Sequence, residues 1–205
     1  MIQIGAEEQE LKLNLRLAQI EHNEECQKDF LTFVRSMWPQ FITGRHHEII
    51  AEKLSRVASG ELKRLIINMA PRHTKSEFAS FLFPAWMMGR TPSMKIIQAT
   101  HTTELAVNFG RKTKNLIDSE GYREIFPEVE LAADSKASGR WDTQAGGMYY
   151  AVGVGSNLAG RGGDLIIIDD PHSEQTAMSN SGFEDAWDWY TGGPRQRLQP
   201  GGSIV

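Results

Sequence analysis

The residues most able to do chemistry lie in one short run, Pro71-Arg72-His73-Thr74-Lys75-Ser76-Glu77. A phosphate-binding loop needs successive backbone N–H groups at a helix start, a lysine for the terminal phosphates and a hydroxyl for Mg²⁺. Lys75 and Ser76 supply the last two. Both glycines of the GxxxxGK[ST] pattern are missing, because Met69 and Thr74 stand in their places. A β-branched threonine is poorly suited to a positive φ, so this run alone is a weak match.

A second run pairs two carboxylates with an apolar segment. Residues 164–168 are mostly aliphatic, and Asp169 and Asp170 follow them directly. In a Walker B arrangement the first carboxylate helps to hold Mg²⁺ and the second orients the attacking water. A buried strand that ends in a polar turn is the common alternative. The two runs together are much less expected by chance than either alone, so they favour a P-loop nucleotide site.

The elements that must position these residues can be predicted from periodicity and from breaks at proline and glycine. Helices are expected over residues 8–37, 45–58, 75–88, 103–117 and 181–198, and strands over residues 64–68, 95–99, 148–154, 164–169 and 203–205. Residues 70–74 form the expected turn, and residues 118–145 are expected to be irregular. Short apolar strands that alternate with helices indicate a mostly parallel sheet with helices on both faces. The ligand crevice of such a sheet lies at the carboxyl ends of its strands.

Composition narrows the class of protein further. The chain has 205 residues and a net charge of −4, but residues 61–114 carry 9 basic against 3 acidic side chains. This basic segment is either a solvated surface or a site for a phosphate-bearing ligand. Cys26 is the single cysteine, which excludes an internal disulfide and a cysteine zinc cluster. The apolar runs are shorter than the roughly 20 residues of a membrane span, and the polar start excludes a secretory signal. We therefore expect an intracellular protein without a membrane partner.

Four stretches of the chain resemble the ATPase domain of tailed-bacteriophage terminase large subunits, the motors that pump DNA into procapsids. They read GELKRLIINMAPRHTKSEFASFLFPAW (60–86), KIIQATHTTELAVNFGRK (95–112), YYAVGVGSNLAGRGGDLIIIDDP (149–171) and WYTGGPRQRLQPGGSIV (189–205). The similarity extends from about Phe30 to the last residue. Two departures are Thr74, where the family usually has glycine, and Asp170, where many members have glutamate.

The resemblance implies a RecA-like (ASCE) P-loop NTPase of the α/β class. Residues 1–60 would form an N-terminal helical segment or lid, and residues 61–205 the ATPase core. A complete family member continues into a coupling motif and a nuclease domain, so we expect this chain to be the ATPase part alone.

The resemblance also implies roles for residues at the two runs, with ATP as substrate and Mg²⁺ as cofactor. Lys75 would bind the β- and γ-phosphates, Ser76 and Asp169 would hold Mg²⁺, and Asp170 would position the attacking water. Arg72 would contact the γ-phosphate; a surface salt bridge is its alternative. The remaining ATP-binding residues of the loop would be Pro71, His73, Thr74 and Glu77.

Three residues before the loop and one arginine after it are further candidates. Phe41, His46 and His47 would lie beside the adenine, where an aromatic or imidazole plane could stack; packing of a helix start against the sheet is equally expected. Arg161, in a glycine-rich run before the second carboxylate segment, would be an arginine finger reaching a neighbouring subunit. It could also contact DNA, or do neither.

The function implied is ATP hydrolysis that moves double-stranded viral DNA into a procapsid in the host cell cytoplasm. The implied partners are double-stranded DNA, the portal protein, the small terminase subunit and copies of the chain itself in a ring, a pentamer by family resemblance. Two other functions remain open. One is a different P-loop DNA translocase or helicase, and the other is a nucleic-acid-binding module without enzymatic activity.

Overall fold

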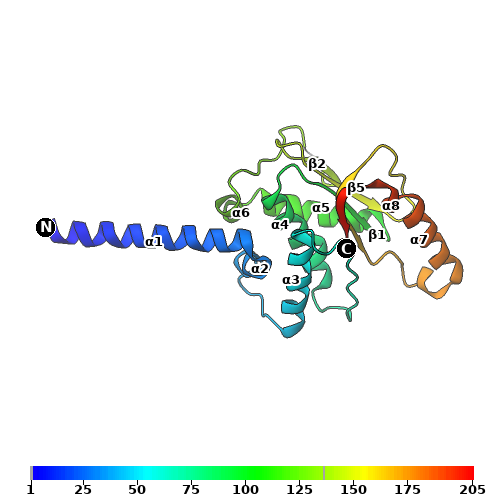
Figure 1. The fold of residues 1–205 in the computed structure, drawn as a ribbon, viewed down its shortest axis with the longest axis horizontal. Helices are drawn as coiled ribbons and strands as arrows, with labels where there is room; N and C mark the ends of the chain where they lie inside the picture. The colour runs from blue at the N-terminus through cyan, green and yellow to red at the C-terminus, as the bar shows by residue number, and fades with distance from the viewer. Residues whose placement is uncertain (1, 136) are drawn as a thin grey trace.

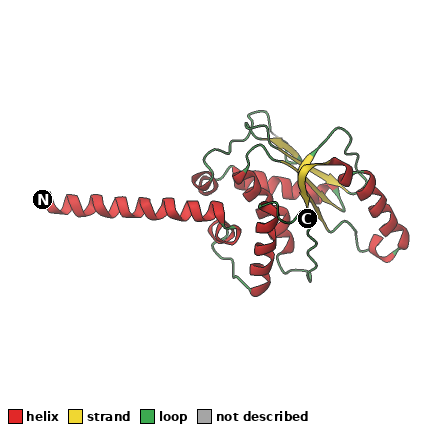
Figure 2. Cartoon of the chain, viewed as in Figure 1, coloured by secondary structure: helices red, strands yellow, loops and turns green. Residues whose placement is uncertain are grey.

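The structure is a computed structural model that describes residues 2–135 and 137–205, and its centre is a mostly parallel β-sheet (Figures 1 and 2). Five strands lie in the order β2-β3-β1-β4-β5. The strands are β1 (Lys95–Thr100), β2 (Arg140–Asp142), β3 (Met148–Gly153), β4 (Gly163–Asp169) and β5 (Leu198–Ile204). β1 pairs in parallel with β3 and β4, β5 is parallel to β4, and only β2 is antiparallel to its neighbour. The predicted α/β class with a mostly parallel sheet is therefore confirmed.

Helices precede the sheet and fill most of its connections. They are α1 (Ile2–Lys28), α2 (Phe30–Met37), α3 (Arg45–Ala58), a π-helical segment η1 (Glu77–Leu82), α4 (Phe83–Arg90), α5 (Thr103–Ile117), α6 (Glu120–Ile125), a 3₁₀ turn η2 (Thr176–Met178), α7 (Asn180–Gly192) and α8 (Pro194–Arg197). Among the described residues, none of these helices is both long enough and apolar enough to cross a membrane.

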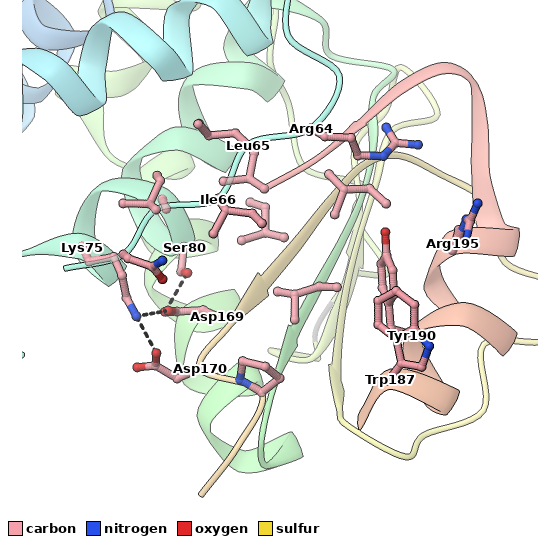
Figure 3. Close-up of a pocket in the computed structure, with 18 residues that line it drawn as sticks. Arg64, Leu65, Ile66, Lys75, Ser80, Asp169, Asp170, Trp187, Tyr190 and Arg195 are labelled. Carbon is pink, nitrogen blue, oxygen red and sulfur yellow. Dashed lines mark hydrogen bonds and ion pairs between the residues drawn. The ribbon is translucent and has the colours of Figure 1, made fainter. Parts of the chain in front are cut away.

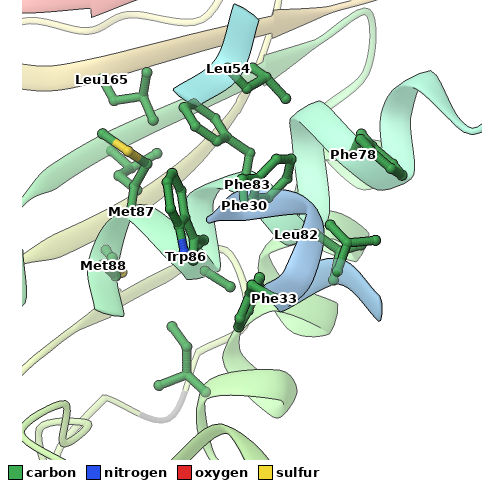
Figure 4. Close-up of a cluster of buried hydrophobic side chains, with 14 of the residues drawn as sticks. Phe30, Phe33, Leu54, Phe78, Leu82, Phe83, Trp86, Met87, Met88 and Leu165 are labelled. Atoms are coloured by element: carbon green, nitrogen blue, oxygen red, sulfur yellow. The ribbon is translucent and has the colours of Figure 1, made fainter. Parts of the chain in front are cut away.

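The core lies on both faces of the sheet because successive side chains of each strand point in opposite directions. On one face Leu165 and Ile167 of β4 join a large cluster with the aromatic residues of α2, η1 and α4, including Trp86 (Figure 4). On the other face Ile166 packs in a smaller cluster with Trp189 of α7. Helices thus cover both faces, as the sequence predicts.

The predicted helix over residues 8–37 is two helices. Asp29 has an extended backbone (φ −115°, ψ 119°), and its side chain accepts a hydrogen bond from the Thr32 N–H at the start of α2. This N-cap satisfies donors that a continuous helix would have satisfied itself. α1 then projects from the body of the molecule as a single rod (Figure 1).

The predicted strand over residues 64–68 is wrong beyond its first residues. The Leu65 N–H donates to the Ile204 carbonyl at 3.0 Å, and Arg64 forms an isolated parallel bridge to Ile204. Residues 66–68 belong to no strand of the described chain. The side chain of Ile66 is 86% exposed.

Several further boundaries differ from the prediction. The helix expected over residues 181–198 breaks at Gly193 because Pro194 lacks an N–H and disfavours a helical residue before it. The stretch expected to be irregular, residues 118–145, contains α6 and β2. The strand predicted over residues 203–205 begins five residues earlier, since β5 spans Leu198–Ile204, and the helix predicted over residues 75–88 contains the π-helical segment η1 before α4. The predicted helices over residues 45–58 and 103–117 and the predicted strands over residues 95–99, 148–154 and 164–169 are confirmed to within about two residues of their ends.

Candidate functional site

The two sequence runs meet at the carboxyl edge of the sheet. Lys75 stands in the first turn of the helix that continues into η1, and Asp169 is the last residue of β4. Strand β5 separates β4 from the segment that leads into residues 69–76, hereafter the candidate phosphate loop. The side chain of Lys75 spans this separation and points to both carboxylates (Figure 3).

Lys75 forms ion pairs with both aspartates. Its Nζ lies 3.4 Å from Asp169 Oδ1 and donates a hydrogen bond to Asp170 Oδ1. Burial lowers the pKa of Lys75, but the hydrogen bond to Asp170 and the two negative charges outweigh burial and raise this pKa above its usual value. The ammonium is therefore held in its charged form. Asp169 is 7% exposed and Asp170 is 63% exposed, so only the second carboxylate is open to solvent.

Asp169 is oriented by a hydroxyl that the sequence analysis missed. The buried Ser80 Oγ donates to Asp169 Oδ2 at 2.9 Å. The prediction that Ser76 and Asp169 together hold Mg²⁺ stays a prediction. Ser80 belongs to η1, a π-helical segment of the kind often found at functional sites. The signal available in the sequence was spacing, since residues four apart on a helix share a face and Ser80 follows Ser76 by four. The bond leaves Asp169 Oδ1 directed toward Lys75.

The candidate phosphate loop has an unusual backbone. Arg72 and Thr74 have φ of 64° and 63°, and Asp170 opposite has φ of 43°. A left-handed conformation costs an L-residue other than glycine roughly 1–2 kcal/mol. Such strain concentrates at functional sites, and alternating hand of this kind can turn successive N–H groups toward an anion. Residues 69–77 and Asp170 line a cavity of about 420 Å³.

A histidine from α3 holds Thr74. His47 Nε2 lies 2.7 Å from Thr74 Oγ1, and Thr74 Oγ1 in turn donates to the His73 carbonyl at 2.6 Å. His47 is 6% exposed. Burial, followed by the neighbouring charges of His46 and His73, lowers the pKa of His47 below its usual value. The neutral ring is therefore favoured at this position.

The residues predicted to lie beside adenine are near the loop. Phe41 and His47 both pack against Phe78 of η1, with ring centroids 5.3 Å and 5.2 Å away. The His46 ring packs against the His47 ring in a tilted arrangement, with centroids 3.8 Å apart and an interplanar angle of 45°, and its centroid lies 5.9 Å from that of the His73 ring. Contact with adenine stays a prediction for all three, and their observed contacts are with the aromatic core and the loop.

The remaining predicted residues divide between the site and elsewhere. Pro71, Arg72, His73 and Ser76 line the loop cavity, and Arg72 is exposed within it. Glu77 also lines the cavity, and it pairs with Lys112 of α5 at 2.8 Å.

Arg161 is not brought to the site. It lies shortly before β4 begins, at the opposite edge of the sheet from Asp169, and its guanidinium stacks 3.7 Å above the Tyr150 ring. An arginine finger toward a neighbouring subunit stays a prediction.

A second and larger hollow adjoins the loop cavity through Lys75 and Asp170. It has a volume of about 650 Å³ and extends between residues 64–68 and the helices α7 and α8. Trp187 and Tyr190 of α7 and Arg195 of α8 line its far side (Figure 3). No motif in the sequence indicates that these side chains belong to the site. They reach it because α7 packs beside β4, a contact between segments that neither run contains.

The oxygen atoms at the site suit Mg²⁺. A buried carboxylate and nearby hydroxyls are hard ligands, and Mg²⁺ is usually held by one or two carboxylates together with waters and substrate phosphates. Within residues 2–135 and 137–205, no three His, Cys, Asp or Glu side chains gather as a metal cluster. Asp169 is the protein carboxylate best placed for such a role.

The fold and the site define an α/β protein with a mostly parallel sheet, in which two aspartates at the carboxyl edge pair with a lysine that follows a loop with left-handed residues. Comparisons of the sequence with protein-family models and with curated proteins found no match. The geometry of the site and the resemblance of the four sequence stretches are the features that bear on function.

Proposed function

We propose that the chain is a RecA-like P-loop ATPase domain, and specifically the ATPase part of a terminase large subunit. The observation that carries the proposal is the position of Lys75. It stands at a helix start after a loop with left-handed residues, and its ammonium contacts the two aspartates that end a parallel strand. Such a helix start favours an anion, and the charged lysine strengthens that preference.

The proposed reaction is in-line attack of water on the γ-phosphate of ATP. A triphosphate in the loop cavity would exchange the Lys75–Asp170 ion pair for a contact between Lys75 and phosphate. That exchange frees the exposed Asp170 carboxylate to accept a hydrogen bond from the attacking water. Arg72, which is exposed in the same cavity, would help to neutralise the transferring group. Asp169, fixed by Ser80, and Ser76 would hold Mg²⁺, which supplies positive charge to the phosphates.

The assignment to a DNA-packaging motor is a finer proposal than the ATP site. It is supported by the GRGGDLIIIDDP and RLQPGG stretches and by the basic segment around the loop. Double-stranded DNA, the portal protein, the small terminase subunit and a homo-oligomeric ring are the corresponding partners. A host-cytoplasmic location follows from the same proposal.

The test is ATP turnover with and without double-stranded DNA, measured for the chain alone and with procapsid and partner proteins. The proposal predicts Mg²⁺-dependent hydrolysis that rises with double-stranded DNA and the assembled partners. A helicase would instead unwind DNA and respond to single strands. Salt-sensitive DNA binding without turnover under every condition would show a non-enzymatic nucleic-acid-binding module and contradict the proposal.

A further inference from the structure

Thr74, next to Lys75 in the candidate phosphate loop, has a backbone conformation that is unusual for its residue type. It is β-branched, it has a φ of 63°, and it is the last residue before Lys75. A β-branched side chain has no intrinsic reason to adopt the left-handed region, so neighbouring groups must hold it there. The hydroxyl of Thr74 provides the hold, because it makes hydrogen bonds to His47 and to the His73 carbonyl.

The directions of these hydrogen bonds follow from one fixed donor. The Gly44 backbone N–H donates to His47 Nδ1 at 2.9 Å, so Nδ1 carries no hydrogen. In the neutral ring Nε2 then carries the hydrogen and donates to Thr74 Oγ1 at 2.7 Å. The Thr74 hydroxyl is left to donate to the His73 carbonyl. Every donor in this chain of bonds therefore has an acceptor.

His47 is itself held rigidly. Its ring stacks on Phe78 with an interplanar angle of 23°, and Phe41 packs edge-on against it at 4.7 Å. Phe78 also belongs to the loop's helix, because its N–H donates to the Thr74 carbonyl at 3.0 Å. His47 thus contacts Thr74 through the hydroxyl and, through Phe78, the helix turn that Thr74 begins.

We propose that His47 is a positioning residue that holds Thr74 in its left-handed conformation and so keeps the candidate phosphate loop shaped for a phosphate. The inference rests on the proposed function. A glycine at this position would adopt the left-handed conformation without steric cost, whereas Thr74 is kept in it by the hydrogen bond from His47. It also makes α3 part of the site, since displacement of α3 would release the loop.

A double-mutant cycle tests this role. The variants are His47→Ala, Thr74→Gly and the two combined, titrated with a fluorescent non-hydrolysable ATP analogue and Mg²⁺, and separately with pyrophosphate. In the Thr74 background His47→Ala is expected to weaken both ligands about tenfold, the equivalent of one hydrogen bond. In the Thr74→Gly background the same change is expected to weaken them less than about twofold.

Matched variants separate positioning from a general loss of structure. Thr74→Val keeps the branched shape without the hydroxyl and should match His47→Ala, while His47→Gln keeps an N–H donor and should retain much of the affinity. His22→Ala removes a histidine of α1 whose contacts are Ser36 and Cys26, and it should leave affinity unchanged. Thermal unfolding identifies any variant that fails to fold, and Thr74→Val keeps the test available if His47→Ala does not fold.

Backbone NMR shifts of residue 74 give a readout that needs no ligand. His47→Ala should move them away from left-handed values, and Thr74→Gly should make the loop insensitive to His47. Equal effects of His47→Ala in both backgrounds would overturn the positioning role. Failure of the folded wild-type chain to bind either ligand would overturn the proposed function, while the shifts of residue 74 would still decide the role of His47.

Discussion

Two loops of the molecule hold left-handed backbone by opposite means. In residues 154–162, hereafter the arginine loop, the left-handed residues are Gly155 and Gly160, with φ of 85° and 74°. A Cβ added at either glycine would meet nothing within 4 Å. In the candidate phosphate loop the left-handed residues are Arg72 and Thr74. Glycine reaches this region at little cost, whereas other residues must be held there by neighbours.

The neighbours differ accordingly. The candidate phosphate loop lies between the His47–Thr74 hydrogen bond and the ion pairs of Lys75 with the aspartates. The arginine loop is anchored by the stack of Arg161 on Tyr150 and by a hydrogen bond from Trp189 Nε1 to the Ser156 carbonyl at 3.0 Å. In the candidate phosphate loop, residues other than glycine adopt the unfavourable left-handed conformation, next to the charges of Lys75 and the two aspartates. In the arginine loop, only glycines adopt it. This contrast favours the candidate phosphate loop as the site of chemistry.

The largest expected effect is that of Lys75→Ala. Loss of the ammonium removes the positive charge that we propose contacts the phosphates, so ATP turnover with DNA and partners should fall at least about 100-fold. Lys95→Ala, at the exposed start of β1 on the other edge of the sheet, is the matched control and should keep turnover. Steady-state phosphate release checks both variants. Normal ATP turnover by Lys75→Ala would contradict the assignment of the chemistry to the candidate phosphate loop.

Asp170→Asn should reduce ATP turnover nearly as much as Lys75→Ala does, and it should reduce nucleotide binding much less. Asparagine tolerates the left-handed backbone of Asp170, so the local backbone should keep its shape, while the carboxylate proposed to accept a hydrogen bond from the attacking water is lost. Single-turnover hydrolysis should fall about 100-fold, with nucleotide affinity within a few-fold of wild type. If Asp170→Asn lowers nucleotide affinity as much as Lys75→Ala does, the separate roles of Lys75 in binding and of Asp170 in hydrolysis are contradicted.

Ser80→Ala should have an intermediate effect that depends on Mg²⁺. Without the hydroxyl, Asp169 Oδ2 loses its 2.9 Å hydrogen bond, and the carboxylate would be less well oriented for the proposed Mg²⁺. Turnover at limiting Mg²⁺ should fall roughly tenfold, and excess Mg²⁺ should restore most of it. If excess Mg²⁺ does not restore turnover, Ser80 contributes to the stability of the fold and does not orient Asp169 for the metal.

Substitutions at the left-handed residues of the two loops should differ in their effect on the free energy of unfolding by about 1 kcal/mol. Gly160→Ala puts an L-residue at φ 74° and should lower the free energy of unfolding by about 1 kcal/mol. Thr74→Gly relieves strain but gives up hydrogen bonds and adds freedom to the unfolded chain, so it should be close to neutral. Urea unfolding measures both. A clear loss in Thr74→Gly with none in Gly160→Ala would reverse the comparison.

The smallest effect expected is a pH dependence carried by His47. Its pKa is lower in the folded protein than in the unfolded chain, so the unfolded chain takes up the proton first as pH falls. This contribution to stability is complete above the unfolded pKa of about 6.5 and is lost as pH drops below it toward the folded pKa. Unfolding of wild type and His47→Gln at pH 7.5 and 5.5 should show the advantage of the wild type shrinking. A constant difference would contradict the buried neutral ring.

Much of the fold could be predicted because its signals are local. Apolar runs such as residues 164–169 and the helix period of residues 103–117 mark their elements directly. The strand predicted over residues 64–68 is wrong beyond its first residues because strand pairing joins segments far apart in the sequence, here Arg64 and Ile204, and is not a local property. The break at Asp29 was missed because an N-cap inside a helical pattern competes with continued helix, and packing decides between them.

The candidate site was predictable in its residue types and less so in its partners. Charge complementarity places Lys75 beside Asp169 and Asp170 once both runs are assigned to one edge of the sheet. The contacts of Ser80 with Asp169 and of His47 with Thr74 join distant elements through particular side-chain orientations. A β-branched residue has a low propensity for positive φ, yet Thr74 adopts it, and its hydroxyl makes hydrogen bonds with His47 and the His73 carbonyl that the sequence does not reveal.

The most direct test of the central claim is an NMR titration of the isotope-labelled chain with Mg²⁺ and a non-hydrolysable ATP analogue. If the candidate phosphate loop binds phosphate, the largest amide shifts will fall on His73, Thr74, Lys75 and Ser76, and Lys75→Ala will abolish them. Amide shifts confined to the arginine loop, or none in a chain that remains folded, would contradict the assignment.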